Sequence, residues 1–66
     1  MPLVTVKLAG TPPTKEQKEY IIKEFTRILA ETLGKNPDRT MVLIEELSTD
    51  NWGFGGESIS TINSKK

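Results

Sequence analysis

MPLVTVKL, residues 1–8, predicts a β-strand at the start of the chain. Successive side chains of a strand point to opposite faces, so every second residue shares a face. One face of this strand is wholly apolar: Pro2, Val4, Val6 and Leu8. A strand with such a face needs other elements to cover it.

Pro2 is chemically unusual because a residue this small behind an initiator methionine normally permits removal of Met1. The mature chain is then expected to begin at Pro2, and its ring nitrogen becomes a basic secondary amine. A proline inside a chain has no such nitrogen. Pro2 is therefore a candidate catalytic residue that acts as general acid/base. The alternative is that Pro2 is only tolerated at a strand start, where no ladder hydrogen bond is lost.

Length and composition indicate a single small domain, residues 1–66, that needs support beyond its own core. A chain of 66 residues with 35% hydrophobic content buries only about 60% of its unfolded surface. The absence of Cys and His removes disulfides and the commonest metal ligands. We expect no metal and no cofactor, and we expect a homo-oligomer.

The charges balance, with nine basic and nine acidic residues. Without a net charge there is no field that favours nucleic acid or an anionic membrane surface, so neither is an expected partner. The sequence lacks an apolar run of the ~20 residues that cross a membrane, and its start lacks the features of a signal peptide. We expect a cytoplasmic protein.

A long amphipathic helix follows the first strand. Thr14 and Gln17 have the spacing of a capping box, which predicts a helix start after the Gly10–Pro13 turn. Apolar residues then recur every three or four positions: Ile21, Ile22, Phe25, Ile28, Leu29 and Leu33. Gly34 is suited to the left-handed position that ends a helix. The helix is therefore amphipathic, with its charged residues on a solvated face.

The run from Met41 to Ile44 is apolar on both faces and predicts a second strand. Strand, helix and strand form a βαβ unit, so the two strands should be parallel with a right-handed crossover. Parallel pairing places Arg39 and Met41 near Pro2. Arg39 is either a surface residue or a clamp for a substrate carboxylate, which its guanidinium suits.

Glu45 and Glu46 follow this strand segment directly. Neighbours on a strand point to opposite faces, so the two carboxylates do not form an acid and base pair. Surface ion pairing is the better interpretation of both.

The last part of the chain places two aromatic residues, Trp52 and Phe54, among three glycines. Such a loop can bring rings close to a backbone or a ligand. Trp52 fills a ligand site, a subunit interface or both. Ile59 is expected at the centre of a short C-terminal strand within residues 57–62, and residues 63–66 are expected to form a frayed tail.

Four segments in this order resemble the 4-oxalocrotonate tautomerase family. They are Pro2 at the start of a short apolar strand, Glu16-Gln17-Lys18 at the helix start, Ile44-Glu45-Glu46 in the second strand, and the run Asn51-Trp52-Gly53-Phe54-Gly55-Gly56. The resemblance covers nearly the whole chain. It implies an α+β fold, with a β-α-β subunit of two parallel strands, one crossover helix and a short C-terminal strand or hairpin, completed by oligomerisation.

The resemblance also implies a function. The sheet of one subunit would join that of a partner in a dimer, commonly with three dimers in a hexamer. Pro2 would move a proton between carbons of an enol acid, and Trp52 would form a dry wall beside the proline nitrogen. Phe54, on the same loop, is a separate candidate for substrate binding.

This chain departs from the family pattern at two arginine positions. The family's arginine in the turn after the first strand is replaced by the Gly10–Pro13 turn, and its arginine in the second strand is replaced by Met41. Arg39 is the nearest substitute, on the same strand face as Met41 if the strand extends that far. The expected substrate is therefore a 2-hydroxy-2-alkenoate or arylpyruvate-type enol acid, bound by Arg39, Met41, Trp52 and Phe54.

Two alternatives stay open at this point. The same fold and proline serve dehalogenation or decarboxylation of a small acid in relatives, although no second water-activating residue is obvious here. A noncatalytic oligomeric binding module that retains Met1 is the alternative outside enzymes.

Overall fold

The computed structural model describes residues 2–65, and its elements alternate as the sequence predicts up to the end of the second strand. The elements in order are β1 (Leu3–Ala9), α1 (Lys15–Leu33), the short 3₁₀ helix η1 (Pro37–Arg39), β2 (Met41–Leu47), η2 (Thr49–Asn51), β3 (Gly53–Phe54), β4 (Glu57–Ser58) and α2 (Ile59–Ser64). Within residues 2–65, neither helix is long and apolar enough to span a membrane.

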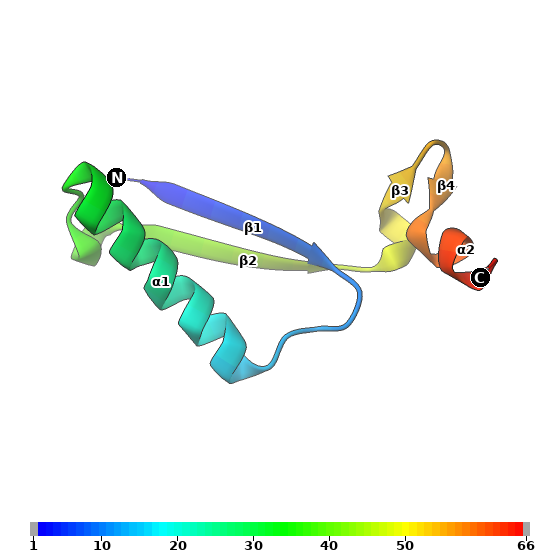
Figure 1. Ribbon diagram of the computed structural model, residues 1–66, viewed down its shortest axis with the longest axis horizontal. Coiled ribbons are helices and arrows are strands. Elements are labelled where there is room, and N and C mark those ends of the chain that lie inside the picture. Colours follow the sequence, from blue (N-terminus) through cyan, green and yellow to red (C-terminus); the bar gives the residue numbers. More distant parts are fainter. Residues whose placement is uncertain (1, 66) are drawn as a thin grey trace.

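The β-α-β unit is confirmed. β1 and β2 pair in parallel, from Leu3 beside Met41 at one end to Ala9 beside Leu47 at the other. The ladder continues one step beyond β1, because the Met41 N–H donates to the Pro2 carbonyl at 3.0 Å. α1 runs along one face of this two-stranded sheet, as Figure 1 shows. The other face of the sheet has no covering element among the described residues.

Both ends of α1 have the predicted caps. The Thr14 hydroxyl accepts from the Gln17 N–H at 3.1 Å, and the Gln17 side chain accepts from the Thr14 N–H at 2.8 Å. At the other end Gly34 adopts a φ of 67°, in the left-handed region, and its N–H donates to the Ala30 carbonyl at 3.0 Å. These caps fix where the helix begins and ends.

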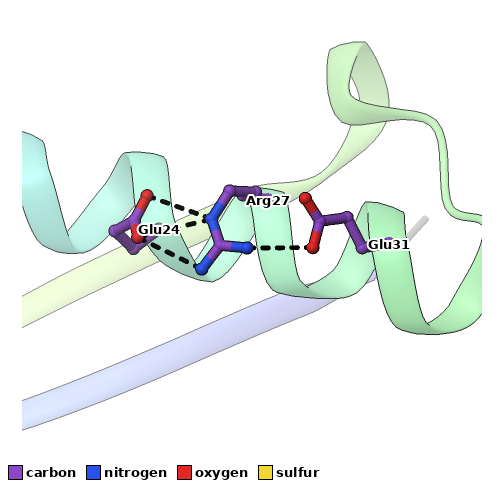
Figure 2. Close-up of polar contacts among 3 residues, drawn as sticks. All are labelled: Glu24, Arg27 and Glu31. Atoms are coloured by element: carbon purple, nitrogen blue, oxygen red, sulfur yellow. Dashed lines mark hydrogen bonds and ion pairs between the residues drawn. The ribbon is translucent and has the colours of Figure 1, made fainter.

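The outer side of α1 has a network of charges centred on Arg27 (Figure 2). Its guanidinium donates to Glu24 one turn before it at 3.2 Å and to Glu31 one turn after it at 2.9 Å. Hydrogen bonds to Glu24 and then Glu31 raise the pKa of Arg27 above its ordinary value. The network lies on the solvated side of the helix.

The C-terminal segment differs from the sequence prediction. β3 and β4 form an antiparallel hairpin through Gly55 and Gly56, whose φ values of 58° and 92° suit the tight turns that favour glycine. The expected hairpin is thus confirmed. Ile59 is not the centre of a strand but the first residue of α2, because the Ser58 hydroxyl caps that helix by accepting the Thr61 N–H at 3.1 Å.

The expectation of a frayed tail at residues 63–66 is also wrong for the part that the structure describes. Asn63 and Ser64 form the last turn of α2, and Lys65 forms an ion pair with Glu57 in β4. Lys66 lies outside the described residues. The hairpin and α2 together form an arm beyond the carboxyl end of the sheet, at the right of Figure 1.

No residue among 2–65 is fully buried, so a single chain has no closed core. The accessible surface is 5133 Å², whereas a compact monomer of this mass exposes about 4,200 Å². The Cα radius of gyration is 15.4 Å, against about 11 Å for a compact domain of this length. The excess of about 900 Å² is close to the area that each partner buries in a protein interface of ordinary size.

Part of the exposed apolar surface lies on the uncovered face of the sheet. Leu3 is 57% exposed, Met41 45% and Leu43 50%, and all three have the same alternation along their strands. The opposite face, with Val4 and Ile44, is shielded in part by α1. The chain therefore presents to solvent the face that a stable domain would bury.

Candidate active site

Pro2 and Met41 meet at the amino end of the sheet. Pro2 directly precedes β1 and is half-buried, and its carbonyl accepts the Met41 N–H at 3.0 Å. Leu3 and Met41 are register partners, which confirms that parallel pairing brings the two strand starts together. Met1 lies outside the described residues, so its removal stays a prediction.

Arg39 also lies at the amino end of the sheet, but in a short 3₁₀ helix and not in an extension of the second strand. It is the last residue of η1 and not an extension of β2, so the suggestion that it shares a strand face with Met41 is wrong. Asn36 caps this turn, since its side chain accepts the Asp38 N–H at 3.0 Å and its carbonyl accepts the Arg39 N–H at 3.0 Å. Among residues 2–65 the exposed Arg39 guanidinium forms no ion pair, which leaves it available to an anion.

Trp52 and Phe54 lie at the opposite end of the sheet from Pro2. Trp52 follows η2, and its carbonyl accepts the Ile59 N–H at 2.7 Å, whereas Phe54 is 64% exposed in β3. A strand of seven residues is about 20 Å long, and the whole of β2 separates Met41 from this arm, as Figure 1 shows. Within one chain Trp52 therefore does not form a wall beside Pro2.

A cavity of about 250 Å³ lies at the carboxyl end of the sheet, between the strand ends and the loop that leads to α1. Its lining is formed by Leu8, Ala9, Gly10, Thr11, Pro12, Pro13, Glu46, Leu47 and Ser48. Sequence reasoning missed this site. The sequence did contain a signal for it. The rigid Gly10–Pro13 turn follows the first strand, and in a parallel pair the end of that strand lies beside the end of the second strand, so the turn can wall a cavity there.

Glu46 contributes the only formal charge in this lining. An ion pair with Lys18 in α1 holds its carboxylate, and both side chains are a little over one third exposed. This confirms surface ion pairing for Glu46. Glu45 has the opposite alternation and lies on the uncovered face of the sheet. Residues 2–65 contain no group of three side chains arranged to hold a metal ion.

The structure thus separates the predicted site residues into two groups. Pro2, Arg39 and Met41 lie at the amino end of the sheet, and Trp52 and Phe54 lie beyond its carboxyl end together with the cavity. Neither group alone combines a base, a cation for a carboxylate and an apolar enclosure.

Comparison with known proteins identifies the family. Residues 2–62 match the family described as tautomerase enzyme. A probable tautomerase of Dickeya dadantii is 48% identical over 60 residues, which cover 91% of this chain and 90% of that protein. The 2-hydroxymuconate tautomerase of Bacillus subtilis is 35% identical over 60 residues, which cover 91% of this chain and 95% of that protein.

Structural comparison identifies the same family. A solved structure of 4-oxalocrotonate tautomerase isozymes from Methylibium petroleiphilum superimposes with a TM-score of 0.88 at 25% identity, covering 98% of this chain and all of that one. The matched region includes the sheet, α1 and the C-terminal arm. The chain therefore belongs to the tautomerase family of enzymes and is an isomerase of the 4-oxalocrotonate tautomerase type.

Proposed function

We propose that this enzyme moves a proton between carbons of a 2-hydroxy-2-alkenoate or arylpyruvate-type enol acid, with Pro2 as general acid/base. The observation that carries the proposal is the position of Pro2. Its carbonyl accepts the Met41 N–H at 3.0 Å, which holds this half-buried residue at the amino end of the sheet beside Met41. With Met1 removed, the ring nitrogen of Pro2 accepts a proton from the enol hydroxyl or from a carbon of the substrate and returns it to another carbon.

A basic nitrogen at this position needs an environment that one chain does not provide. A free terminal amine in water is mostly protonated at neutral pH and so cannot accept a proton. Burial disfavours the charged form, and an aromatic wall would supply that burial. Because Trp52 and Phe54 lie beyond the far end of β2, the wall must come from another subunit.

The open sheet suggests how a second copy supplies it. β1 and β2 each have one unpaired edge, and a two-fold axis makes two identical strands run antiparallel. Pairing at either edge therefore brings the amino end of one sheet to the carboxyl end of the other. In such a dimer, Pro2 of one copy faces the Trp52 arm and the carboxyl-end cavity of its partner.

A homo-oligomer also accounts for the missing core. Strand pairing leaves the face with Leu3, Met41 and Leu43 uncovered, so further association of dimers is needed to bury it. A hexamer of three dimers is the assembly that we propose, with a dimer as the smaller alternative.

Arg39 is the proposed partner of the substrate carboxylate. It lies two residues before Met41, it is exposed, and its guanidinium suits a bidentate bond to a carboxylate. Met41, at 45% exposure, provides an apolar surface beside Pro2 for the carbon chain of the substrate.

The test compares the Met1-free protein with a form that carries one extra residue before Pro2. The extension turns the ring nitrogen into an amide without basicity, so kcat/KM for an arylpyruvate enol should fall by about a hundredfold or more. Pro2→Ala, which keeps a terminal amine, is the matched control and should retain more activity than the extended form. Intact mass establishes the start of each protein. Full activity in the extended, correctly assembled form would exclude Pro2 as the base.

A further inference from the structure

The turn that carries Arg39 is held together by Asn36 and Pro37. The Asn36 side chain accepts the Asp38 N–H at 3.0 Å. The Asn36 carbonyl accepts the Arg39 N–H at 3.0 Å and the Thr40 hydroxyl at 3.0 Å. The Thr40 N–H donates to the Pro37 carbonyl at 3.3 Å. The backbone N–H groups of residues 38–40 are therefore all satisfied within the turn, although most of the turn is exposed.

Pro37 adds a restraint that does not depend on hydrogen bonds. Its ring fixes φ near the helical value, and it holds Asn36 before it in an extended conformation, with ψ at 118°. The chain therefore loses little conformational freedom when the turn forms. The Arg39 side chain, in contrast, is exposed, and its guanidinium forms no ion pair within residues 2–65. The turn fixes the Arg39 backbone and leaves the guanidinium free to meet a ligand.

The same turn is joined directly to Pro2. Thr40 is followed by Met41, whose N–H donates to the Pro2 carbonyl at 3.0 Å. A short path of hydrogen bonds and chain therefore connects Asn36 with Pro2 through Thr40 and Met41. The Arg39 backbone is thus fixed relative to the residue that we propose as the base.

We infer that Asn36 and Thr40 are positioning residues for substrate binding: they hold the Arg39 backbone at the amino end of the sheet, where its guanidinium meets the substrate carboxylate. A ligand that must order a loop loses part of its binding free energy to that ordering, and a preorganised loop avoids this loss. The inference rests on the proposed function, because it takes Arg39 as the partner of the carboxylate. Asn36 and Thr40 themselves need no contact with the substrate.

A positioning role and a purely structural role have different consequences. A purely structural cap stabilises the fold, so its loss has the same effect whether or not Arg39 is present. A positioning residue acts through the guanidinium, so its loss should weaken carboxylate binding only while Arg39 is present. We expect the carboxylate contact to be equal in the bound substrate and in the transition state. Its weakening should therefore raise KM and leave kcat nearly unchanged.

The experiment measures binding and turnover with the assembled, Met1-free protein. Titration calorimetry with phenylpropanoate, an unreactive monocarboxylate, gives Kd, and steady-state kinetics with an arylpyruvate enol gives KM and kcat. Asn36→Ala removes the side-chain bond to Asp38 and should raise Kd and KM by about five- to tenfold, with kcat changed by less than about twofold. Thr40→Val removes the hydroxyl bond with little change of shape and should raise both constants by about threefold. Asn36→Ser restores a capping oxygen and should recover most of the loss.

Arg39→Ala provides the background that separates the two roles. Asn36→Ala added to Arg39→Ala should change Kd and KM by less than about twofold, because no guanidinium remains to be positioned. Thr14→Ala is the matched control, since it removes a cap at the opposite end of α1 from η1. It should lower stability and leave Kd and KM unchanged. Circular dichroism and sedimentation establish that each variant is folded and assembled.

Unchanged Kd and KM in both Asn36→Ala and Thr40→Val would overturn the inference, and so would an equal effect of Asn36→Ala with and without Arg39. Either result leaves the proposed function intact when Arg39→Ala still weakens binding. Unchanged binding in Arg39→Ala, or no binding of phenylpropanoate to the unmodified protein, would overturn the inference together with the proposed carboxylate partner. Kinetics of the form extended before Pro2 test the base separately, so a failure of proton transfer is distinguishable from a failure of the positioning residues.

Discussion

Substitution of Leu43 by Asp tests whether the chain needs a partner to complete its core. Leu43 lies in the middle of β2 on the uncovered face of the sheet and is 50% exposed. Complete burial of a leucine side chain contributes about 1.5–3 kcal/mol, so covering the exposed half contributes about 1 kcal/mol in each subunit. Leu43→Asp removes this gain from both sides of a symmetric contact.

The introduced carboxylate adds a larger effect than the lost apolar contact. An unpaired charge taken into an interface costs several kcal/mol, on top of the ~2 kcal/mol that two subunits lose. We therefore expect the dissociation constant of the assembly to rise by at least about thirtyfold. Because the isolated chain lacks a closed core, dissociation should also reduce the native circular dichroism.

Sedimentation velocity at micromolar concentration, together with thermal melting at several concentrations, measures both effects. Leu43→Met keeps the apolar contact and should stay assembled, and Lys23→Asp places the same new carboxylate at an exposed position of α1 and should also stay assembled. An assembled Leu43→Asp protein with an unchanged melting temperature would refute the reasoning. A compact, folded monomer of the unmodified chain would refute it too.

Three further predictions concern individual side chains. Arg39→Ala should lower kcat/KM for enol acids by about ten- to a hundredfold through the loss of a charge-assisted hydrogen bond, and Arg39→Lys should recover part of the loss. Unchanged steady-state kinetics in Arg39→Ala would show that Arg39 is a surface residue without a role in substrate binding. Thr14→Ala removes the cap of α1 and should lower the free energy of unfolding by about 1 kcal/mol, seen as a lower urea midpoint; Thr14→Ser should retain most of it. Gly56→Ala places a Cβ at a φ of 92° and should destabilise the hairpin by about 1–2 kcal/mol. A urea unfolding midpoint equal to that of the unmodified protein would contradict the assigned turn.

The β-α-β unit was predictable because its signals are local. Alternation along residues 2–8, a capping box at Thr14 and a glycine at the end of the helix each depend on residues within a few positions of one another. Parallel pairing then follows from the length of the connection. These inferences also placed Met41 beside Pro2, since strand starts coincide in a parallel pair.

Two elements that differ from the prediction also have local capping signals in the sequence. Asn36 followed by Pro37 is a cap with a proline at the first helical position, which is typical of the turn that holds Arg39 out of β2. Ser58 three residues before Thr61 is likewise a cap, and it starts α2 where a strand was expected. At residues 57–62 the apolar Ile59 favoured a strand, although Ser58 is a capping residue.

The relation between Pro2 and Trp52 could not be predicted from spacing along one chain. Resemblance to the family associates the two residues, yet the register of β1 and β2 places them at opposite ends of the sheet. The Lys18–Glu46 pair joins residues from different elements and depends on how α1 lies across β2. Such placements follow from tertiary and quaternary structure, which no periodicity encodes.

The same open sheet explains both the missing core and the divided site, and this links catalysis to assembly. Leu43→Asp should abolish tautomerase activity although Leu43 has no role in proton transfer, because the proposed strand-paired dimer, which brings Pro2 to the Trp52 arm of a partner, needs the face with Leu43 to be buried for its core. A one-residue extension before Pro2 should abolish activity while the assembly stays intact. Mixing these two inactive proteins should restore little activity, since the first does not associate and the second has no basic nitrogen. Activity per subunit should also fall on dilution below the dissociation constant of the assembly, whereas a site completed within one chain would be independent of concentration.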